Sequence, residues 1–201
     1  MRLMLLVVLL FSQAAVPIER EPRHVTVFAS GALRVFEILV PAGDTTLDHT
    51  HSYDLANVCI ECSPTRTRPV GQDWGPVRPR ELGSVAITEY TGQPSTHAVR
   101  NIGDGRYHLI AVENRGTAGW STTAAVSAPA TTVTEDARAF RIYRVHLMGD
   151  VTRTTHVHAM PTVVVNGTGA SRGQWRVIPA GETHTVTAAD AGGDVVEIEL
   201  R

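Results

Sequence analysis

Residues 43–51 have the sequence Gly-Asp-Thr-Thr-Leu-Asp-His-Thr-His, and a second His-x-His, His156-Val157-His158, follows at an offset of 107 in the numbering. Side chains alternate between the two faces of a β-strand, so both imidazoles of a His-x-His point to one side. Two imidazoles on one face can converge on one metal ion, and a third histidine from another strand would leave open coordination positions. The pattern therefore predicts a strand that carries metal ligands, twice in one chain.

The two His-x-His pairs belong to a longer internal repeat. Arg34-Val35-Phe36 corresponds to Arg141-Ile142-Tyr143, and the offset is again 107. His97 and His184 follow downstream at an offset of 87, so the connecting segment is 20 residues shorter in the second copy. Such equal spacings predict the duplication of one β-unit. The additional residues of the first copy fall around 64–80.

Short stretches of alternating apolar and polar residues dominate the 201-residue chain, and no long stretch has a helical period. With 17 Gly and 11 Pro between them, these stretches predict an all-β sandwich or barrel. Residues 121–134 consist mainly of Ala, Ser, Thr and Pro, which is typical of a linker. We therefore expect two β-domains, at 15–120 and 138–201, joined by a linker at 121–137.

The repeated residues resemble the motifs of the cupin superfamily. Residues 43–51 resemble the opening of its first motif, and His97-Ala98-Val99-Arg100-Asn101 resembles the end of its second. Pro179-Ala180-Gly181-Glu182-Thr183-His184 resembles the second motif again. The resemblance implies a bicupin, two tandem antiparallel jelly-roll-like β-barrels. It also implies two metal sites with the ligands His49, His51 and His97, and His156, His158 and His184.

The sequence departs from the cupin pattern at one ligand. The glutamate ligand of the family falls at Leu55 in the first copy and at Thr162 in the second. Three neutral histidines leave the charge of a divalent ion (Fe, Mn, Ni or Zn) uncompensated, which favours a small anionic or chelating ligand. Glu182, two residues before His184, is a candidate general base, although it is also a common spacer in that motif. The remaining histidines, His24, His108 and His146, are interpreted as surface or core residues.

Three kinds of function fit this pattern. The first is a metal-dependent enzyme, such as an oxygenase of the quercetinase or thiol dioxygenase kind or an isomerase. The second is a barrel that binds a small ligand or a metal without turnover, and the third is an interaction protein with one degenerate barrel used for homodimerisation. The arginines around 64–80 either meet an anionic ligand at a barrel mouth or are solvated. The chain has no Lys and a net charge of −2, which excludes Schiff-base chemistry and argues against nucleic acid as a partner.

The N-terminus and the two cysteines bear on the cellular compartment. Met1-Arg2, an apolar run over 3–11 and small residues up to Ala15 predict a signal peptide at 1–14, cleaved after Ala14, and a secreted or periplasmic protein without a mature membrane span. The alternative is a buried first strand or helix. Cys59 and Cys62 are structural thiols, a disulfide or reactive groups; on a regular strand they would point to opposite faces, so a disulfide needs a turn at Glu61.

Overall fold

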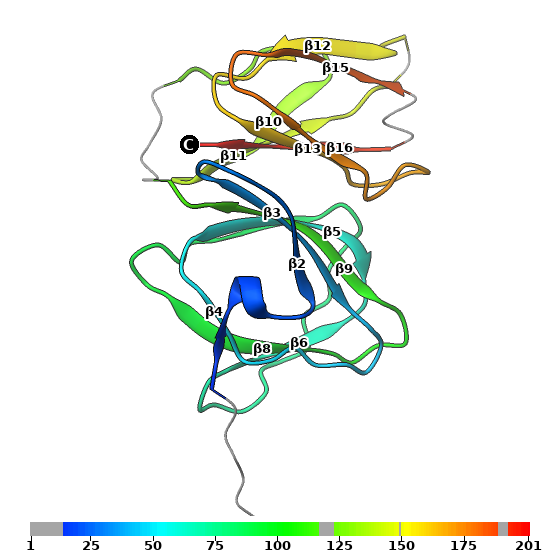
Figure 1. Ribbon diagram of the computed structural model, residues 1–201. Coiled ribbons are helices and arrows are strands. Elements are labelled where there is room, and N and C mark those ends of the chain that lie inside the picture. The colour runs from blue at the N-terminus through cyan, green and yellow to red at the C-terminus, as the bar shows by residue number, and fades with distance from the viewer. Residues whose placement is uncertain (1–13, 117–122, 149, 189–192) are drawn as a thin grey trace, which may run out of the picture.

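The computed structural model describes residues 14–116, 123–148, 150–188 and 193–201 (Figure 1). Its described elements are β-strands and one short 3₁₀ helix, η1 (Ile18–Arg20), which confirms the predicted all-β class. The predicted signal peptide lies almost wholly outside the described residues. No helix of the described part is both long and apolar enough to cross a bilayer. The strands are β1 (Val16–Pro17), β2 (His24–Ser30), β3 (Leu33–Val40), β4 (His49–His51), β5 (Asp54–Cys62), β6 (Thr65–Pro69), β7 (Val85–Thr88), β8 (Ser95–Asn101), β9 (Tyr107–Asn114), β10 (Thr131–Asp136), β11 (Phe140–Val145), β12 (Arg153–Val157), β13 (Thr162–Asn166), β14 (Trp175–Ile178), β15 (Thr183–Thr187) and β16 (Val195–Leu200).

Each half of the chain contains two sheets. In the first half, a five-stranded sheet has the order β2-β3-β9-β5-β7, and a four-stranded sheet has the order β1-β4-β8-β6. In the second half, a five-stranded sheet has the order β10-β11-β16-β13-β14, and β12 pairs only with β15. The two five-stranded sheets match strand for strand, which is the structural counterpart of the repeat found in the sequence. The first half adds β6, within the segment predicted to be extra.

The repeat extends further than the sequence motifs indicated. The register of β2 against β3 shifts between Thr26 and Phe28, and that of β10 against β11 shifts between Val133 and Glu135, at the same offset as the His-x-His pairs. Part of the segment predicted as the linker 121–137, namely 131–136, forms the strand β10, while 121–122 lie outside the described residues. Thr and Val suit an edge strand, and β10 occupies the position that β2 has in the first half.

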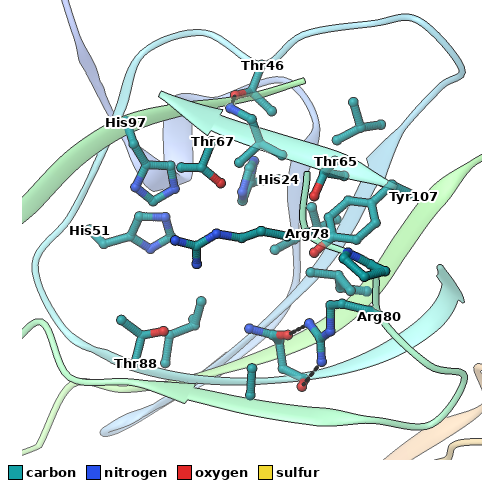
Figure 2. Close-up of a pocket in the computed structure, with 18 of the residues that line it drawn as sticks. His24, Thr46, His51, Thr65, Thr67, Arg78, Arg80, Thr88, His97 and Tyr107 are labelled. Atoms are coloured by element: carbon teal, nitrogen blue, oxygen red, sulfur yellow. Dashed lines mark hydrogen bonds between the residues drawn. The ribbon is translucent and has the colours of Figure 1, made fainter. Parts of the chain in front are cut away.

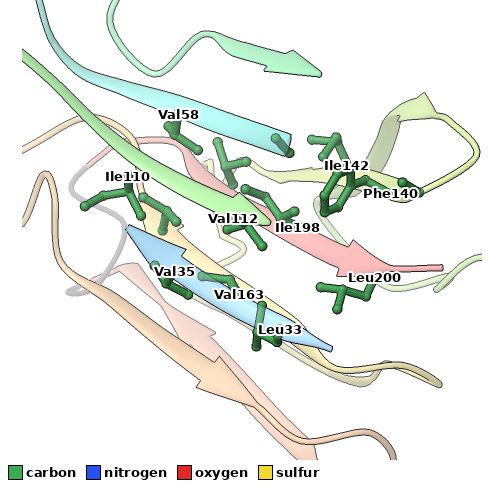
Figure 3. Close-up of a cluster of buried hydrophobic side chains, with 14 of the residues drawn as sticks. Leu33, Val35, Val58, Ile110, Val112, Phe140, Ile142, Val163, Ile198 and Leu200 are labelled. Carbon is green, nitrogen blue, oxygen red and sulfur yellow. The ribbon is translucent and has the colours of Figure 1, made fainter. Parts of the chain in front are cut away.

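The two halves share one hydrophobic core (Figure 3). Away from their bulges, the strands of both five-stranded sheets alternate, so that one face of each sheet points toward the other half and the opposite face points into its own half. On β9, Ile110 and Val112 belong to the shared core, whereas Leu109 and Ala111 face the interior of the first half. The shared core consists of Leu33, Val35, Ala56, Val58, Ile60, Ile110, Val112, Ala139, Phe140, Ile142, Val163, Val165, Val196, Ile198 and Leu200.

Cys59 and Cys62 form a disulfide with a Cα–Cα distance of 5.8 Å. The register of β5 against β9 shifts between Cys59 and Glu61, which is a β-bulge. A bulge adds one residue to the strand, so it reverses the facing of the residues that follow. This is the local irregularity that the i, i+3 spacing required for a disulfide.

Candidate metal centres

The first histidine cluster lies between the two sheets of the first half. β4 pairs with β8 so that His49 is directly opposite His97, and the period of two places His51 on the same inner face. The ring centroids of His97 lie 4.8 Å from His49 and 4.9 Å from His51. On the outer face, the hydroxyl oxygens of Thr50 and Thr96 lie 2.9 Å apart and join the two strands. The rings of the three predicted ligands are therefore brought together, but the group whose ligand atoms all lie within 4.8 Å of one another contains His49 and His51 with His24 in place of His97.

His24 is a fourth member of this cluster: it is buried, in agreement with its interpretation as a core residue, but that interpretation did not place it beside His49 and His51. It comes from β2 in the facing sheet, and its ring lies 4.5 Å from that of His49. The candidate ligand atoms of His24, His49 and His51 all lie within 4.8 Å of one another. His24 precedes His49 at no motif spacing, so only the fold brings it to the site.

Hydrogen bonds at Nδ1 orient two imidazoles of this cluster and leave their Nε2 atoms available to an ion. Nδ1 of His49 donates to the backbone oxygen of Leu47 at 2.9 Å, and Nδ1 of His24 donates to Glu21 at 2.6 Å. Both bonds leave the Nε2 lone pair free, and such acceptors behind the ring are what orients a metal-ligating imidazole. Nδ1 of His51 is buried without a hydrogen-bond partner. The residues therefore fit a divalent metal ion.

Burial keeps the imidazoles of His49, His51 and His97 neutral. It lowers the pKa of His49 to about 3, with a further contribution from His24, and the pKa of His51 to about 2, with a further contribution from His97. Burial likewise lowers the pKa of His97 to about 4. Metal ligation requires unprotonated imidazole, so near neutral pH these ligands need not release a proton.

A cavity of about 680 Å³ opens beside this cluster (Figure 2). This volume is typical of small-molecule sites. Its described lining combines polar and aliphatic side chains, and it contains no Asp or Glu. The lining consists of His24, Ile38, Val40, Thr46, His51, Leu55, Asn57, Thr65, Thr67, Val77, Arg78, Pro79, Arg80, Ala86, Thr88, Tyr90, His97, Val99, Tyr107 and Leu109.

Two arginines of the extra segment reach this cavity. Figure 2 shows the Arg78 side chain extending along the cavity toward His51. Within the described residues the acceptors that hold Arg80 are neutral: the side-chain and backbone oxygens of Asn57 and of Ser84. By contrast, Arg68 bonds to Asp48 at the protein surface. The arginines of this segment were expected either to meet an anionic ligand at a barrel mouth or to be solvated. Arg78 and Arg80 fit the first expectation, because both line the cavity.

The second cluster is more compact. His156 on β12 is directly opposite His184 on β15, and His158 follows β12. The Nε2 atoms of His156 and His158 lie 2.9 and 3.1 Å from Oε2 of Glu197, and Nε2 of His184 lies 2.9 Å from its Oε1. All four side chains are buried. The predicted ligands of this half are brought together as well, with a carboxylate among them.

The second cluster also fits a metal ion. Ligand atoms of a tetrahedral zinc site lie about 3.3 Å apart, since Zn–N bonds are about 2.0–2.1 Å long, and the three contacts to Glu197 are only slightly shorter. Burial opposes the ionised form of Glu197, but hydrogen bonds from the three histidines lower its pKa well below the usual range. Burial also disfavours charged His158, yet Glu197 and Glu199 raise its pKa to about 9. The Nδ1 of His158 lies 2.9 Å from Glu199, which holds the orientation of the ring.

Sequence reasoning missed Glu197, and it wrongly gave this half three histidines without a carboxylate. The family motif places the glutamate on a different strand, at Thr162. Glu197 lies on β16, where its counterpart in the first half is Ala111, because Tyr143 pairs with Glu197 as Phe36 pairs with Ala111. The sequence feature that could have indicated this carboxylate is the presence of two glutamates, Glu197 and Glu199, in the otherwise apolar strand 195–200. Alanine at the matching position leaves the first centre without a carboxylate among its candidate ligands, and Glu21 contacts it only through Nδ1 of His24.

Glu182, the candidate general base, lies in the exposed turn before β15. It is not among the four residues that could hold the ion. The carboxylate in contact with the imidazoles is Glu197, so the base role of Glu182 stays a prediction.

Solved structures with this fold are cupin-domain proteins. The Escherichia coli protein YlbA matches with a TM-score of 0.61 and 8% identity over 90% of this chain and 85% of its own. The E. coli pirin YhhW in complex with nickel(II) matches with a TM-score of 0.60 and 17% identity, over 88% and 90%. A salicylate 1,2-dioxygenase from Pseudaminobacter salicylatoxidans matches with a TM-score of 0.55 and 14% identity, over 84% and 70%.

These identities establish the fold and nothing further. No family model matches the sequence, and no curated protein is similar to it at a significant level. The chain has the cupin fold in both halves, as its histidine motifs indicated, and it contains buried histidine groups that could bind metal ions.

Proposed function

We propose that the first half is a metal-dependent oxygenase site for a small carboxylate that chelates the ion. The observation that carries this proposal is the cavity of about 680 Å³, where three lining histidines and two arginines meet without any acidic side chain in the described lining. A divalent ion would add two further positive charges. A negatively charged ligand would compensate this excess of buried positive charge.

The residues that line the cavity fit a ligand with a chelating carboxylate at one end and an apolar body. His49, His51 and His97, joined by His24, would hold the ion, and Arg78 reaches toward His51 to bind a carboxylate. Aliphatic residues, among them Leu55 and Leu109, also line the cavity and suit an apolar body. A 2-hydroxy- or 2-oxo-carboxylate with an aromatic or branched body satisfies both ends.

An oxygenase fits the proton chemistry of the cavity better than an isomerase does. An isomerase needs a side chain that takes a proton from carbon near neutral pH. The pKa values of His49, His51 and His97 are lowered to about 3, 2 and 4, so these imidazoles are weak bases. Burial raises the pKa of Tyr90, which stacks on His51 at 4.6 Å, so this phenol stays protonated and can donate to the ligand. The bound ion would act as a Lewis acid or bind dioxygen.

The test uses the untagged chain, purified without added metal. Elemental mass spectrometry should find iron, manganese, nickel or zinc, and His49→Ala/His51→Ala should lose the ion of this centre. Salicylate, mandelate and phenylpyruvate are then screened by calorimetry and by consumption of dissolved dioxygen. We expect Arg78→Leu to weaken carboxylate binding at least tenfold, whereas Arg66→Leu, at an exposed position, leaves it unchanged.

The outcomes separate the functions. Metal and carboxylate binding without dioxygen consumption under any loading would replace the oxygenase by a non-catalytic binding barrel. Carboxylate binding that is insensitive to Arg78→Leu would refute the ligand orientation. Failure of His49→Ala/His51→Ala to lose an ion would refute the metal centre.

We also propose that the protein works outside the cytoplasm, in the periplasm or the medium. The residue pattern of 1–14 supports this proposal, and the Cys59–Cys62 disulfide suits an oxidising compartment. N-terminal sequencing of the protein recovered from its native host should begin at Ala15. A cytoplasmic chain that retains Met1 would refute it.

A further inference from the structure

The two-stranded ribbon of β12 and β15 has few means of attachment to the rest of the second half. It pairs with no other described strand, and two strands alone are marginally stable in water. Its counterparts in the first half, β4 and β8, are flanked by β1 and β6 in a four-stranded sheet. Figure 1 shows the ribbon lying apart from the five-stranded sheet, above β10, β11, β13 and β16.

The buried face of this ribbon is mostly polar. Its buried residues are Thr154 and His156 on β12 and His184 and Val186 on β15. Only Val186 belongs to the apolar cluster between the ribbon and the sheet. The hydroxyl of Thr154 has no hydrogen-bond partner. Hydrophobic contact therefore provides little of the attachment.

The second histidine cluster spans this junction. His156 and His184 belong to the ribbon, while Glu197 belongs to β16 in the middle of the facing sheet. His158 contacts Glu197 with one ring nitrogen and Glu199 of the same strand with the other. An ion bound here would connect two sheets that have no strand pairing between them.

This cluster differs from the first in access. His24, His51 and His97 line the cavity of about 680 Å³, whereas none of the four ligands of the second cluster, which are at most 8% exposed, lines either of the two cavities found beside the described residues. Four protein ligands without an open position are the mark of a structural metal site, whereas catalytic sites keep a position for water or substrate. Three imidazoles and one carboxylate suit zinc in tetrahedral geometry.

We propose that His156, His158, His184 and Glu197 form a closed structural zinc site that fastens the β12–β15 ribbon to the five-stranded sheet. This inference concerns the second centre alone and does not depend on the reaction proposed for the first. Without the ion, the same carboxylate accepts hydrogen bonds from the imidazoles, so the ribbon is held more weakly rather than released.

The experiment uses the full chain carrying His49→Ala/His51→Ala, which leaves only the second centre intact. We expect one zinc per chain after zinc loading and dialysis. Removal of the ion by dipicolinate should speed amide hydrogen exchange in β12 and β15 at least tenfold, with a smaller change in β3 and β9, and added zinc should restore protection. The same exchange comparison on the wild-type chain serves if the variant does not fold.

Two further variants sharpen the result. Glu197→Gln keeps the side-chain shape but removes the charge, and it should abolish zinc retention at this centre. His146→Ala removes an exposed histidine of the same half and should retain the ion. The proposal is overturned if no zinc is retained, or if ribbon exchange is the same with and without zinc. Zinc retention and hydrogen exchange of the ribbon do not depend on carboxylate binding at the first centre. A failure of the function proposed for the first half would therefore leave both measurements unchanged.

Discussion

Truncation of Ile110 to alanine tests whether the two halves form one cooperative unit. Ile110 lies on β9 in the first half, is 1% exposed, and belongs to the core that both halves share. Three lost carbons correspond to about 2.4 kcal/mol of transfer free energy at about 0.8 kcal/mol each. A fully retained cavity of roughly 80 Å³ would add about 1.9 kcal/mol. Because the site collapses in part, we expect the free energy of unfolding to fall by about 2.5 to 4 kcal/mol, and Tm by about 5 to 16 °C.

Native-state hydrogen exchange read by mass spectrometry resolves the two halves. In a shared-core unit, protection of the most stable amides should fall by a similar free energy in β9 and in β11 and β16, although the substitution is confined to the first half. Val25→Ala, at a position 56% exposed, should change protection by less than about 0.5 kcal/mol. Reduced protection in β9 with unchanged protection in β11 and β16 would refute the shared-core argument.

Buried polar contacts and the disulfide give three further tests. Asn114→Ala removes an amide that donates to two backbone oxygens of the second half at 3.0 and 3.1 Å; thermal unfolding should show a loss of about 2 to 4 kcal/mol, and a loss under about 1 kcal/mol would contradict this. Glu113→Ala removes the partner of half-buried Arg34 at 2.5 Å, leaves it Glu19 at 3.7 Å, and should cost about 3 kcal/mol in urea unfolding. Since burial raises the pKa of Glu113 despite Arg34, Arg34→Met/Glu113→Leu should be close to wild type, and equal damage in both variants would speak against it. Cys59→Ala/Cys62→Ala opens a small loop and should lower stability by about 2 kcal/mol; a loss above about 4 kcal/mol would show another role for the pair.

Local periodicity explains why much of the first centre was predictable. A His-x-His on a strand places two imidazoles on one face whatever the rest of the fold does. The repeat at a constant offset then indicated that His97 and His184 occupy matching positions. The structure agrees, because His49 lies opposite His97 and His156 lies opposite His184.

The missed residues depend on contacts between elements that are far apart in the chain. His24 enters the first cluster from a facing sheet, and Glu197 enters the second from the last strand. Neither position belongs to a motif, and an alternating strand pattern does not indicate which charged residue is buried. The edge strand β10 was missed for a related reason, since its Thr-rich sequence forms a strand by pairing with β11.

The amino-acid sequence by itself determined the β class, the duplication and the six histidines, since each follows from spacing along one strand or between two copies of one unit. Tertiary structure alone decided how the halves join and how their centres differ. Ala111 and Glu197 occupy matching positions on β9 and β16, where the small side chain leaves the first centre without a carboxylate among its candidate ligands and the carboxylate occupies the middle of the second. That difference depends on what each side chain faces across the interior, and such contacts are set by packing between sheets rather than by the order of residues along a strand.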